Sequence, residues 1–315
     1  MSFTWPNEPT AGAKQSDFAD YAELLCLQSG ICSFTKISCD IGRLEENNYE
    51  NGVQEYSRLD EDIELAFKEI ERRQVACSEE NYPFNISPTG RSIKISSTLT
   101  SAHILYCYLL LATRLNMKTD RNHGDIDGTL LFEHVSAAIA ASFWGSRSDS
   151  MVFGTASEGS FEAKIEELCQ RLGEGECFIN RNTGAVTQND GKLDVVVWKG
   201  FSDCRQGKLI GFGQCKTGRN WRDQLTQLQP DIFCSSWMRD TPPVKPVRLF
   251  FVAESVGNEQ WYTQISNGGL IFDRCRILDY FSDEMSDSTT QDVKKWLLSA
   301  TTTRELNYIA NILNT

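Results

Sequence analysis

Two β-prone segments, residues 192–198 and 208–216, constrain the fold of this chain more than any other feature. Leu193, Val195 and Val197 share one face of the first segment if it is a strand, and the polar, glycine-containing loop between the two segments predicts a hairpin. On the first strand Asp194 points away from its apolar neighbours. On the second strand Gln214 and Lys216 share one face, since they are two residues apart. Pairing of these strands therefore brings a carboxylate, an amide oxygen and an ammonium group together.

The elements around this hairpin predict a mixed α/β domain. The sequence indicates a helix at 161–172, a strand at 177–180, a helix at 220–228 and further strands at 247–253 and 269–272. The resulting order of helix, three strands, helix and strand predicts a central mixed sheet flanked by helices.

The first 150 residues are expected to form a separate, mostly helical domain. Apolar residues recur there at helical spacing, and a polar stretch at 145–150 follows them. A length of 315 residues also fits two domains, which we place at 1–150 and 151–315. The helices expected in the first domain and in the C-terminal tail cover residues 18–27, 59–75, 99–115, 130–143, 291–298 and 303–313.

The side chains of the predicted hairpin suit phosphodiester hydrolysis. The Asp194 carboxylate and the Gln214 carbonyl can hold a hard Mg²⁺ ion that keeps most of its waters. Lys216 can orient or deprotonate one of these waters and offset charge that develops on the phosphate. Arg219 and Arg222 open the next predicted helix, where they can clamp a phosphate at the helix N-terminus. A solvated polar helix face is the alternative interpretation of these two arginines.

Three short stretches resemble the PD-(D/E)XK, or restriction-endonuclease-like, superfamily. They are GSFE at 159–162, DGKLD at 190–194 and QCK at 214–216, and they look most like the Mrr-type branch, in which Gln commonly replaces the acidic residue of the last motif. The resemblance covers about residues 155–255 and implies an αβββαβ core. A helix glutamate supports the metal site in that branch, which carries over onto Glu162, with Glu166 as its substitute. KLD replaces the usual Pro-Asp or Gly-Ile-Asp, which is a departure from the family pattern.

The resemblance implies a Mg²⁺- or Mn²⁺-dependent endonuclease that acts on DNA rather than RNA. It also implies an effector subunit of a bacterial anti-phage or restriction-type system, controlled by a partner such as an ATPase or helicase. The net charge of −12 disfavours tight, unaided DNA binding, so a local basic patch or a partner subunit would have to engage the DNA. The alternative is a catalytically inactive nuclease-like fold that acts as a binding or assembly module.

Other functional classes have weaker support. The stretch DIDGT at 125–129 matches a motif of haloacid-dehalogenase-like phosphatases, but no buried strand precedes it. We therefore expect Asp127 or Thr129 to cap the helix at Leu130. His103, His123 and His134 all lie in the N-terminal half, which disfavours a Cys/His nucleophile pair on the hairpin.

Cysteine spacing and hydropathy limit the remaining possibilities. The eleven cysteines include no Cys-x-x-Cys pair, so a structural zinc site is disfavoured and mostly buried thiols are expected. The N-terminal residues show no signal-peptide pattern, and no apolar run approaches the roughly 20 residues that span a bilayer. The sequence thus predicts a cytoplasmic protein without a membrane segment.

Overall fold

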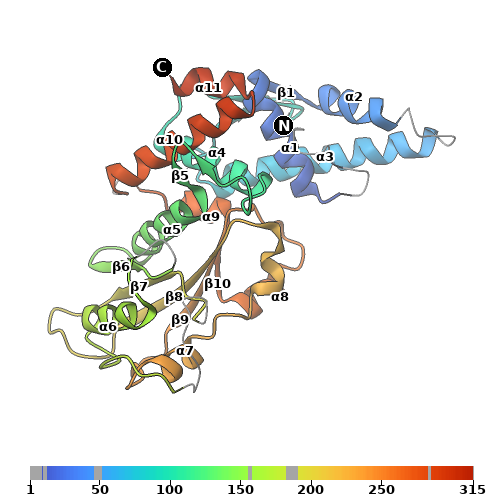
Figure 1. Ribbon diagram of the computed structural model, residues 1–315. Helices are drawn as coiled ribbons and strands as arrows, with labels where there is room; N and C mark the ends of the chain where they lie inside the picture. Colours follow the sequence, from blue (N-terminus) through green and yellow to red (C-terminus); the bar gives the residue numbers. More distant parts are fainter. Residues whose placement is uncertain are drawn as a thin grey trace.

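The computed structural model describes residues 9, 13–45, 52–154, 158–181, 191–282 and 285–314. Within these ranges the chain is a mixed α/β protein, with helices gathered at one end and a five-stranded sheet at the other (Figure 1). None of the described helices is both long and apolar enough to cross a bilayer.

The helical end combines segments from both ends of the chain. The last two helices return to the N-terminal ones, because α10 contacts α4 and α11 contacts α1. A three-stranded antiparallel sheet of order β1-β3-β2 and a short β4-β5 hairpin complete this part. The helices are α1 (Gln15–Ser29), α2 (Phe34–Glu45), α3 (Gly52–Ala76), α4 (Ser101–Arg114), α10 (Asp287–Thr303) and α11 (Asn307–Leu313); the strands are β1 (Ile31–Ser33), β2 (Phe84–Ile86), β3 (Ser92–Ile95), β4 (Asn122–His123) and β5 (Ile126–Asp127).

The large sheet has the order β10-β9-β8-β7-β6. Strands β6, β7 and β8 are antiparallel neighbours, whereas β8, β9 and β10 are parallel. The pairing of Val195 with Gly213 confirms the predicted hairpin and places Asp194 directly before β7, beside the end of β8. The strands are β6 (Ser148–Val152), β7 (Val195–Lys199), β8 (Leu209–Lys216), β9 (Val247–Val252) and β10 (Leu270–Phe272).

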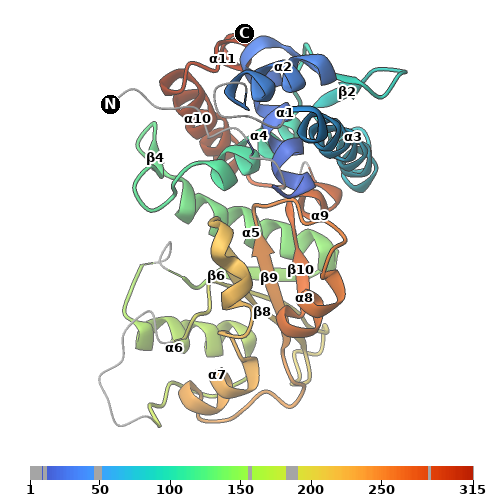
Figure 2. The same cartoon turned by 90° about the vertical axis from the view of Figure 1, so that its right-hand side faces the viewer.

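Helices cover both faces of this sheet. Helix α5 (Gly128–Trp144) lies between the sheet and the helical end, and α9 (Arg274–Asp279) follows β10 there (Figure 2). Val197 and Phe251 point to this side and belong to the same core as α4 and α5. The opposite face packs against α6 (Phe161–Leu172), the 3₁₀ helix η1 (Arg219–Gln224), α7 (Pro230–Trp237) and α8 (Trp261–Gly268).

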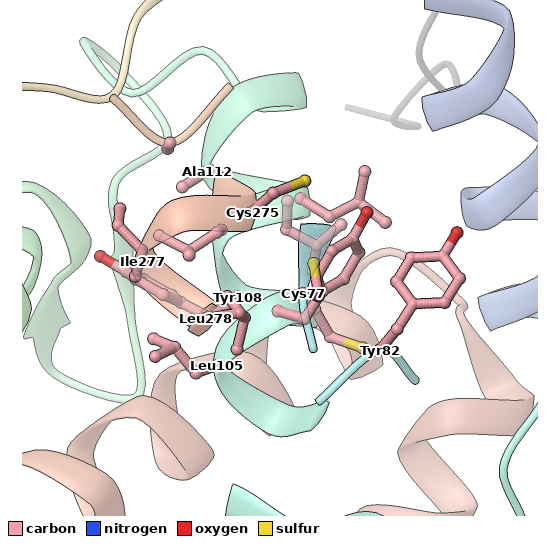
Figure 3. Packing of buried hydrophobic residues seen from close by; sticks show 14 of the residues in the cluster. Cys77, Tyr82, Leu105, Tyr108, Ala112, Cys275, Ile277 and Leu278 are labelled. Atoms are coloured by element: carbon pink, nitrogen blue, oxygen red, sulfur yellow. The ribbon is translucent and has the colours of Figure 1, made fainter. Parts of the chain in front are cut away.

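One hydrophobic core joins the two ends of the molecule. It includes buried residues of α1, α3, α4 and α5, of β7 and β9, and of the C-terminal helices. Figure 3 shows Cys77, Tyr82, Leu105, Cys275 and Leu278, which come from distant segments, packed in this core. Residues on both sides of the predicted boundary at 150 thus share one core, and β6 crosses the boundary itself.

Buried ion pairs also connect the helices α1, α3 and α9. Arg73 of α3 and Arg274 of α9 are both fully buried. Arg73 Nη1 donates to Asp20 Oδ1 at 2.7 Å and to Glu23 Oε1 at 2.9 Å, and Arg274 Nη1 donates to the same Asp20 oxygen at 2.9 Å. The arginines hold the pKa of the Asp20 carboxyl well below its usual range, although burial acts in the opposite direction. The pairs therefore tie α1, α3 and α9 to one another.

Two predicted elements are corrected. Residues 177–180 form no strand, and only Phe178 makes an isolated antiparallel bridge, with Met238. The first strand of the antiparallel set is instead β6, which begins in the polar stretch expected to mark the domain boundary. The helix predicted at 220–228 is the 3₁₀ helix η1 with a kink at Asn220, and the α-helix starts later, at Pro230. Asp190, the first residue of the DGKLD stretch, lies outside the described residues.

Candidate active site

Asp194 is held from both neighbouring strands. Its amide donates to Gly213 O at 2.9 Å, and its carbonyl accepts from Phe153 N at 2.7 Å and Gly154 N at 2.9 Å. Its side chain accepts a hydrogen bond from the amide of Cys215. Burial raises the pKa of the Asp194 carboxyl, while the charge of Lys216 and the Cys215 hydrogen bond act to lower it. The carboxylate is therefore fixed in orientation and poorly solvated.

Gln214 is fully buried on β8. Its Nε2 donates to Gln227 Oε1 at 3.2 Å, on the segment that follows η1. Among the described residues, its Oε1 has no hydrogen-bond partner. Since buried polar atoms are nearly always satisfied, this carbonyl oxygen is an acceptor that the described part of the chain leaves unused.

Lys216 ends β8 and shares a strand face with Gln214. Its side chain is half-buried, and its charge acts on both the Asp194 carboxyl and the Cys215 thiol. The structure thus gathers Asp194, Gln214 and Lys216 at one end of the β7–β8 hairpin. Cys215 points to the other side, toward Ser136 of α5, and burial raises the pKa of its thiol well above the usual range.

Two buried charged residues near this end of the hairpin were not predicted. Glu133 of α5 influences the pKa of Cys215 and that of Lys164. Lys164 of α6 donates through Nζ to Gly154 O at 2.7 Å, and burial lowers its pKa. A Cβ at Gly154 would lie 2.5 Å from Glu133 Oε2, so a larger residue there would force this carboxylate to move. The sequence feature that could have revealed Glu133 is that it is a single acidic residue within the apolar run of α5.

Glu162 and Glu166 lie on the exposed side of α6. They line a shallow hollow with Ser160, Ala163, Glu167, Gln170 and Glu176, and none of Asp194, Gln214 and Lys216 borders it. Glu166 Oε1 accepts a hydrogen bond from Phe178 N at 3.0 Å. The expected support of a metal site by Glu162 or Glu166 stays a prediction, and the buried charged residue of this helix is Lys164.

Arg219 and Arg222 take part in ion pairs within the chain. Arg219 Nη2 lies 2.5 Å from Asp17 Oδ1 of α1, and Arg222 Nη2 lies 2.8 Å from Glu254 Oε1. The short 3₁₀ helix that carries them differs from the α-helix expected behind a phosphate clamp. Phosphate binding by these arginines therefore requires an exchange of partners and stays a prediction.

The competing motifs have structural explanations. Asp127 Oδ1 accepts from the amides of Thr129 at 2.8 Å and Leu130 at 3.4 Å, which confirms Asp127 as the cap of α5. The preceding β4–β5 hairpin has two-residue strands, so the DIDGT stretch lacks the buried strand that a phosphatase nucleophile requires. Seven of the eleven cysteines are buried, as expected.

The donor set at the hairpin fits a hard divalent cation. The Asp194 carboxylate and the free Gln214 Oε1 are oxygen ligands of the kind that Mg²⁺ and Mn²⁺ prefer. The site differs from a cluster of acids, because no group of three His, Cys, Asp or Glu side chains in the described ranges is arranged to hold a metal. A cation here would depend on the amide oxygen, on main-chain oxygens and on its own waters.

The chain matches no protein-family model, and comparison with curated proteins and with solved structures finds no significant similarity. The assignment of a function consequently depends on the geometry of the hairpin and on the chemistry of its side chains.

Proposed function

We propose that this protein is a metal-dependent nuclease that hydrolyses phosphodiester bonds of DNA at Asp194, Gln214 and Lys216. The observation that carries the proposal is the unused, fully buried Oε1 of Gln214 on the strand beside a desolvated Asp194 carboxylate. An unpaired buried acceptor and a poorly solvated carboxylate both destabilise the folded protein, and a divalent cation would relieve both.

The order of elements also supports this proposal. Helix α5, strands β6, β7 and β8, helix α7 and strand β9 follow the αβββαβ order of restriction-endonuclease-like nucleases, if α6 is regarded as an insertion between β6 and β7. In this alignment α5 takes the place of the first core helix. We therefore propose Glu133 as a second candidate, beside Glu162, for the supporting helix glutamate.

Each side chain has a defined role in the proposed reaction. Asp194 and Gln214 would hold the cation, which supplies electrostatic stabilisation of the phosphate and of the leaving oxygen. Lys216 would orient or deprotonate the attacking water and offset negative charge on the phosphate in the transition state. The hydrogen bond from Cys215 N keeps the Asp194 carboxylate in one orientation before substrate arrives.

The charge of the chain supports a partner for DNA engagement. With 43 acidic and 31 basic residues, the protein repels a polyanion at long range. The two arginines nearest to Lys216 in the sequence are neutralised by Asp17 and Glu254. We propose that a separate subunit, such as an ATPase or helicase of an anti-phage or restriction-type system, delivers the DNA.

Cleavage of plasmid and linear DNA with Mg²⁺ or Mn²⁺ tests this function. The wild type is compared with Asp194→Ala, Lys216→Ala and Lys199→Ala, each with and without any co-purifying subunit. Lys199 is the matched control, because it lies at the opposite end of β7 and donates to Trp144 O.

Loss of cleavage in the first two variants alone, with unchanged circular dichroism, supports the assignment. Equal cleavage by all four proteins contradicts the site. Absence of cleavage by the wild type with every partner and metal favours the alternative, a nuclease-like binding or assembly module.

A further inference from the structure

Arg219 is the exposed arginine closest in the sequence to the proposed active site. It follows Lys216 by three residues, so their Cα atoms are at most roughly 11 Å apart. Residues 218–220 are exposed, and a Cβ added to Gly218 would meet no atom within 4 Å beyond its chain neighbours. A DNA strand carries a phosphate about every 3.4 Å along the helix axis. A strand cleaved at Lys216 therefore places other phosphates within reach of the Arg219 guanidinium.

A carboxylate from the first helix occupies this arginine. Arg219 Nη2 lies 2.5 Å from Oδ1 of Asp17, which is in the first turn of α1. The Arg219 side chain is 52% exposed, whereas that of Asp17 is 15% exposed. Asp17 thus takes up the positive charge that a DNA phosphate would otherwise attract.

Asp17 is itself held in place by a buried network of ion pairs. Arg114 Nη2 lies 2.9 Å from the same Asp17 oxygen, and Arg114 Nε donates to Asp20 Oδ2 at 2.7 Å. Asp20 is bound in turn by two fully buried arginines. The Asp17 carboxylate is therefore fixed without Arg219, whereas Arg219 has no other ion pair within the described part of the chain.

Arg222 provides a contrast within the same 3₁₀ helix. Its Nη1 and Nη2 donate to the two oxygens of Glu254 at 3.1 and 2.8 Å. Its guanidinium also stacks over the ring of Trp221, whose Nε1 donates to the same carboxylate. This bidentate, partly buried pair fixes η1 to the segment that follows β9. A single exposed contact such as that of Arg219 contributes far less to stability and is exchanged more readily.

We propose that the Asp17–Arg219 pair is an autoinhibitory contact, through which α1 withholds a DNA-binding arginine from the substrate. A phosphate replaces the Asp17 carboxylate when DNA is delivered, and Asp17 then keeps Arg114 as its partner. Because an exposed ion pair is weak, the contact lowers the affinity for DNA by a small factor and does not prevent binding. The inference rests on the proposed action on DNA, but its test does not depend on cleavage by the hairpin.

A double-mutant cycle measured by DNA binding tests the proposal. Fluorescence anisotropy with a labelled DNA duplex, at one fixed low salt concentration and without divalent metal, compares the wild type with Asp17→Asn, Arg219→Ala and the double variant. We expect Asp17→Asn to bind roughly two- to fivefold more tightly, which is the range that an exposed ion pair accounts for. Arg219→Ala alone should change the affinity by less than about twofold, because its charge is already taken up. The double variant should lose the gain of Asp17→Asn.

Asp203→Asn is the matched control. It also removes one acid and releases an exposed arginine, because Arg205 Nε lies 2.7 Å from Asp203 Oδ2. This pair lies in the loop between β7 and β8, at the opposite end of the hairpin from Lys216. Asp17→Asn should fold as the wild type does, since Asn keeps an acceptor for Arg114 and Arg114 keeps Asp20; urea unfolding checks this.

Three results overturn the proposal. Equal gains in Asp17→Asn and Asp203→Asn attribute the effect to net charge alone. A gain that survives Arg219→Ala shows that this arginine is not the group released. Unchanged affinity in Asp17→Asn, including the case in which no variant binds DNA, shows that the contact restrains nothing. A protein that gains affinity through Arg219 and yet cuts no DNA retains this inference and loses the proposed nuclease function.

Discussion

The main-chain amide of Cys215 donates a 2.7 Å hydrogen bond to Oδ2 of Asp194. The bond crosses from β8 to the residue before β7, and it orients the carboxylate without satisfying all of its acceptor capacity. Burial nevertheless raises the pKa of this carboxyl. The folded protein thus holds an ionised group in a place that is unfavourable for it, as is common at functional sites.

Asp194→Asn should stabilise the metal-free protein at neutral pH. A carboxyl with a raised pKa binds protons more tightly in the folded state, so the wild type loses stability as pH rises above the ordinary value of 3.8. Asn keeps an acceptor for Cys215 N and has no charge. We expect a gain on the order of 1 kcal/mol in urea unfolding at pH 7.5, which disappears as pH falls toward the ordinary value of 3.8.

Mg²⁺ provides the control for this variant. Millimolar Mg²⁺ should raise the unfolding midpoint of the wild type and leave that of Asp194→Asn unchanged, because only the carboxylate attracts the cation strongly. A variant that is less stable than the wild type at pH 7.5, or one equally stabilised by Mg²⁺, would contradict the account of a desolvated metal ligand.

Gln214→Glu should make the metal-free protein less stable and increase its affinity for a metal ion. The substitution removes the Nε2 donor to Gln227 and leaves a buried carboxylate facing the Gln227 carbonyl. We expect a loss of about 2 kcal/mol without metal, and a larger stabilisation by Mn²⁺ than the wild type shows. Gln227→Ala is the control, because it removes the same hydrogen bond without adding charge. Equal Mn²⁺ responses in all three proteins would exclude Gln214 as a ligand.

The hairpin and helix α6 were predictable because their signals are local. The β-prone apolar run of β7 and the 3.6-residue period of α6 each lie within a single element. The same is true of the capping role of Asp127. The shared face of Gln214 and Lys216 follows from the periodicity of β8, and the pairing of Val195 with Gly213 brings Asp194 beside them.

Other features depend on contacts that no local pattern records. Strand β6 is the edge of the sheet and carries Ser148, Asp149 and Ser150, so it lacks the apolar alternation of a half-buried strand. Glu133 enters the site only because α5 packs against the sheet near Gly154. The packing of α10 and α11 against the N-terminal helices is likewise a long-range effect. The division predicted at residue 150 instead assigns these two helices to the second domain.

Arg73→Met should destabilise the protein strongly, because it removes the arginine that three buried carboxylates share. Arg73 is fully buried and bonds Asp20, Glu23 and Glu69. Removal of one member of such a network typically costs about 3–5 kcal/mol. Urea unfolding followed by tryptophan fluorescence measures the loss. Arg205→Met serves as control, since its pair with Asp203 is on the surface, and it should leave the midpoint unchanged. Equal midpoints for the two variants would show that the network contributes little.

His103→Gln should make the protein lose less stability in mild acid than the wild type loses. His103 accepts from Thr100 N through Nδ1 and lies 2.9 Å from Glu80 O through Nε2, so it is held as the neutral tautomer. Burial lowers its pKa below the ordinary value of 6.5. The unfolded chain therefore takes up a proton first, and the wild type loses stability as pH falls through 6.5. Gln fits the same capping box and does not titrate. Between pH 7.5 and 5.5 we expect the urea midpoint of the variant to fall less than that of the wild type. The difference corresponds to at most about 1 kcal/mol in the free energy of unfolding. Parallel pH profiles of the two proteins would refute the assignment.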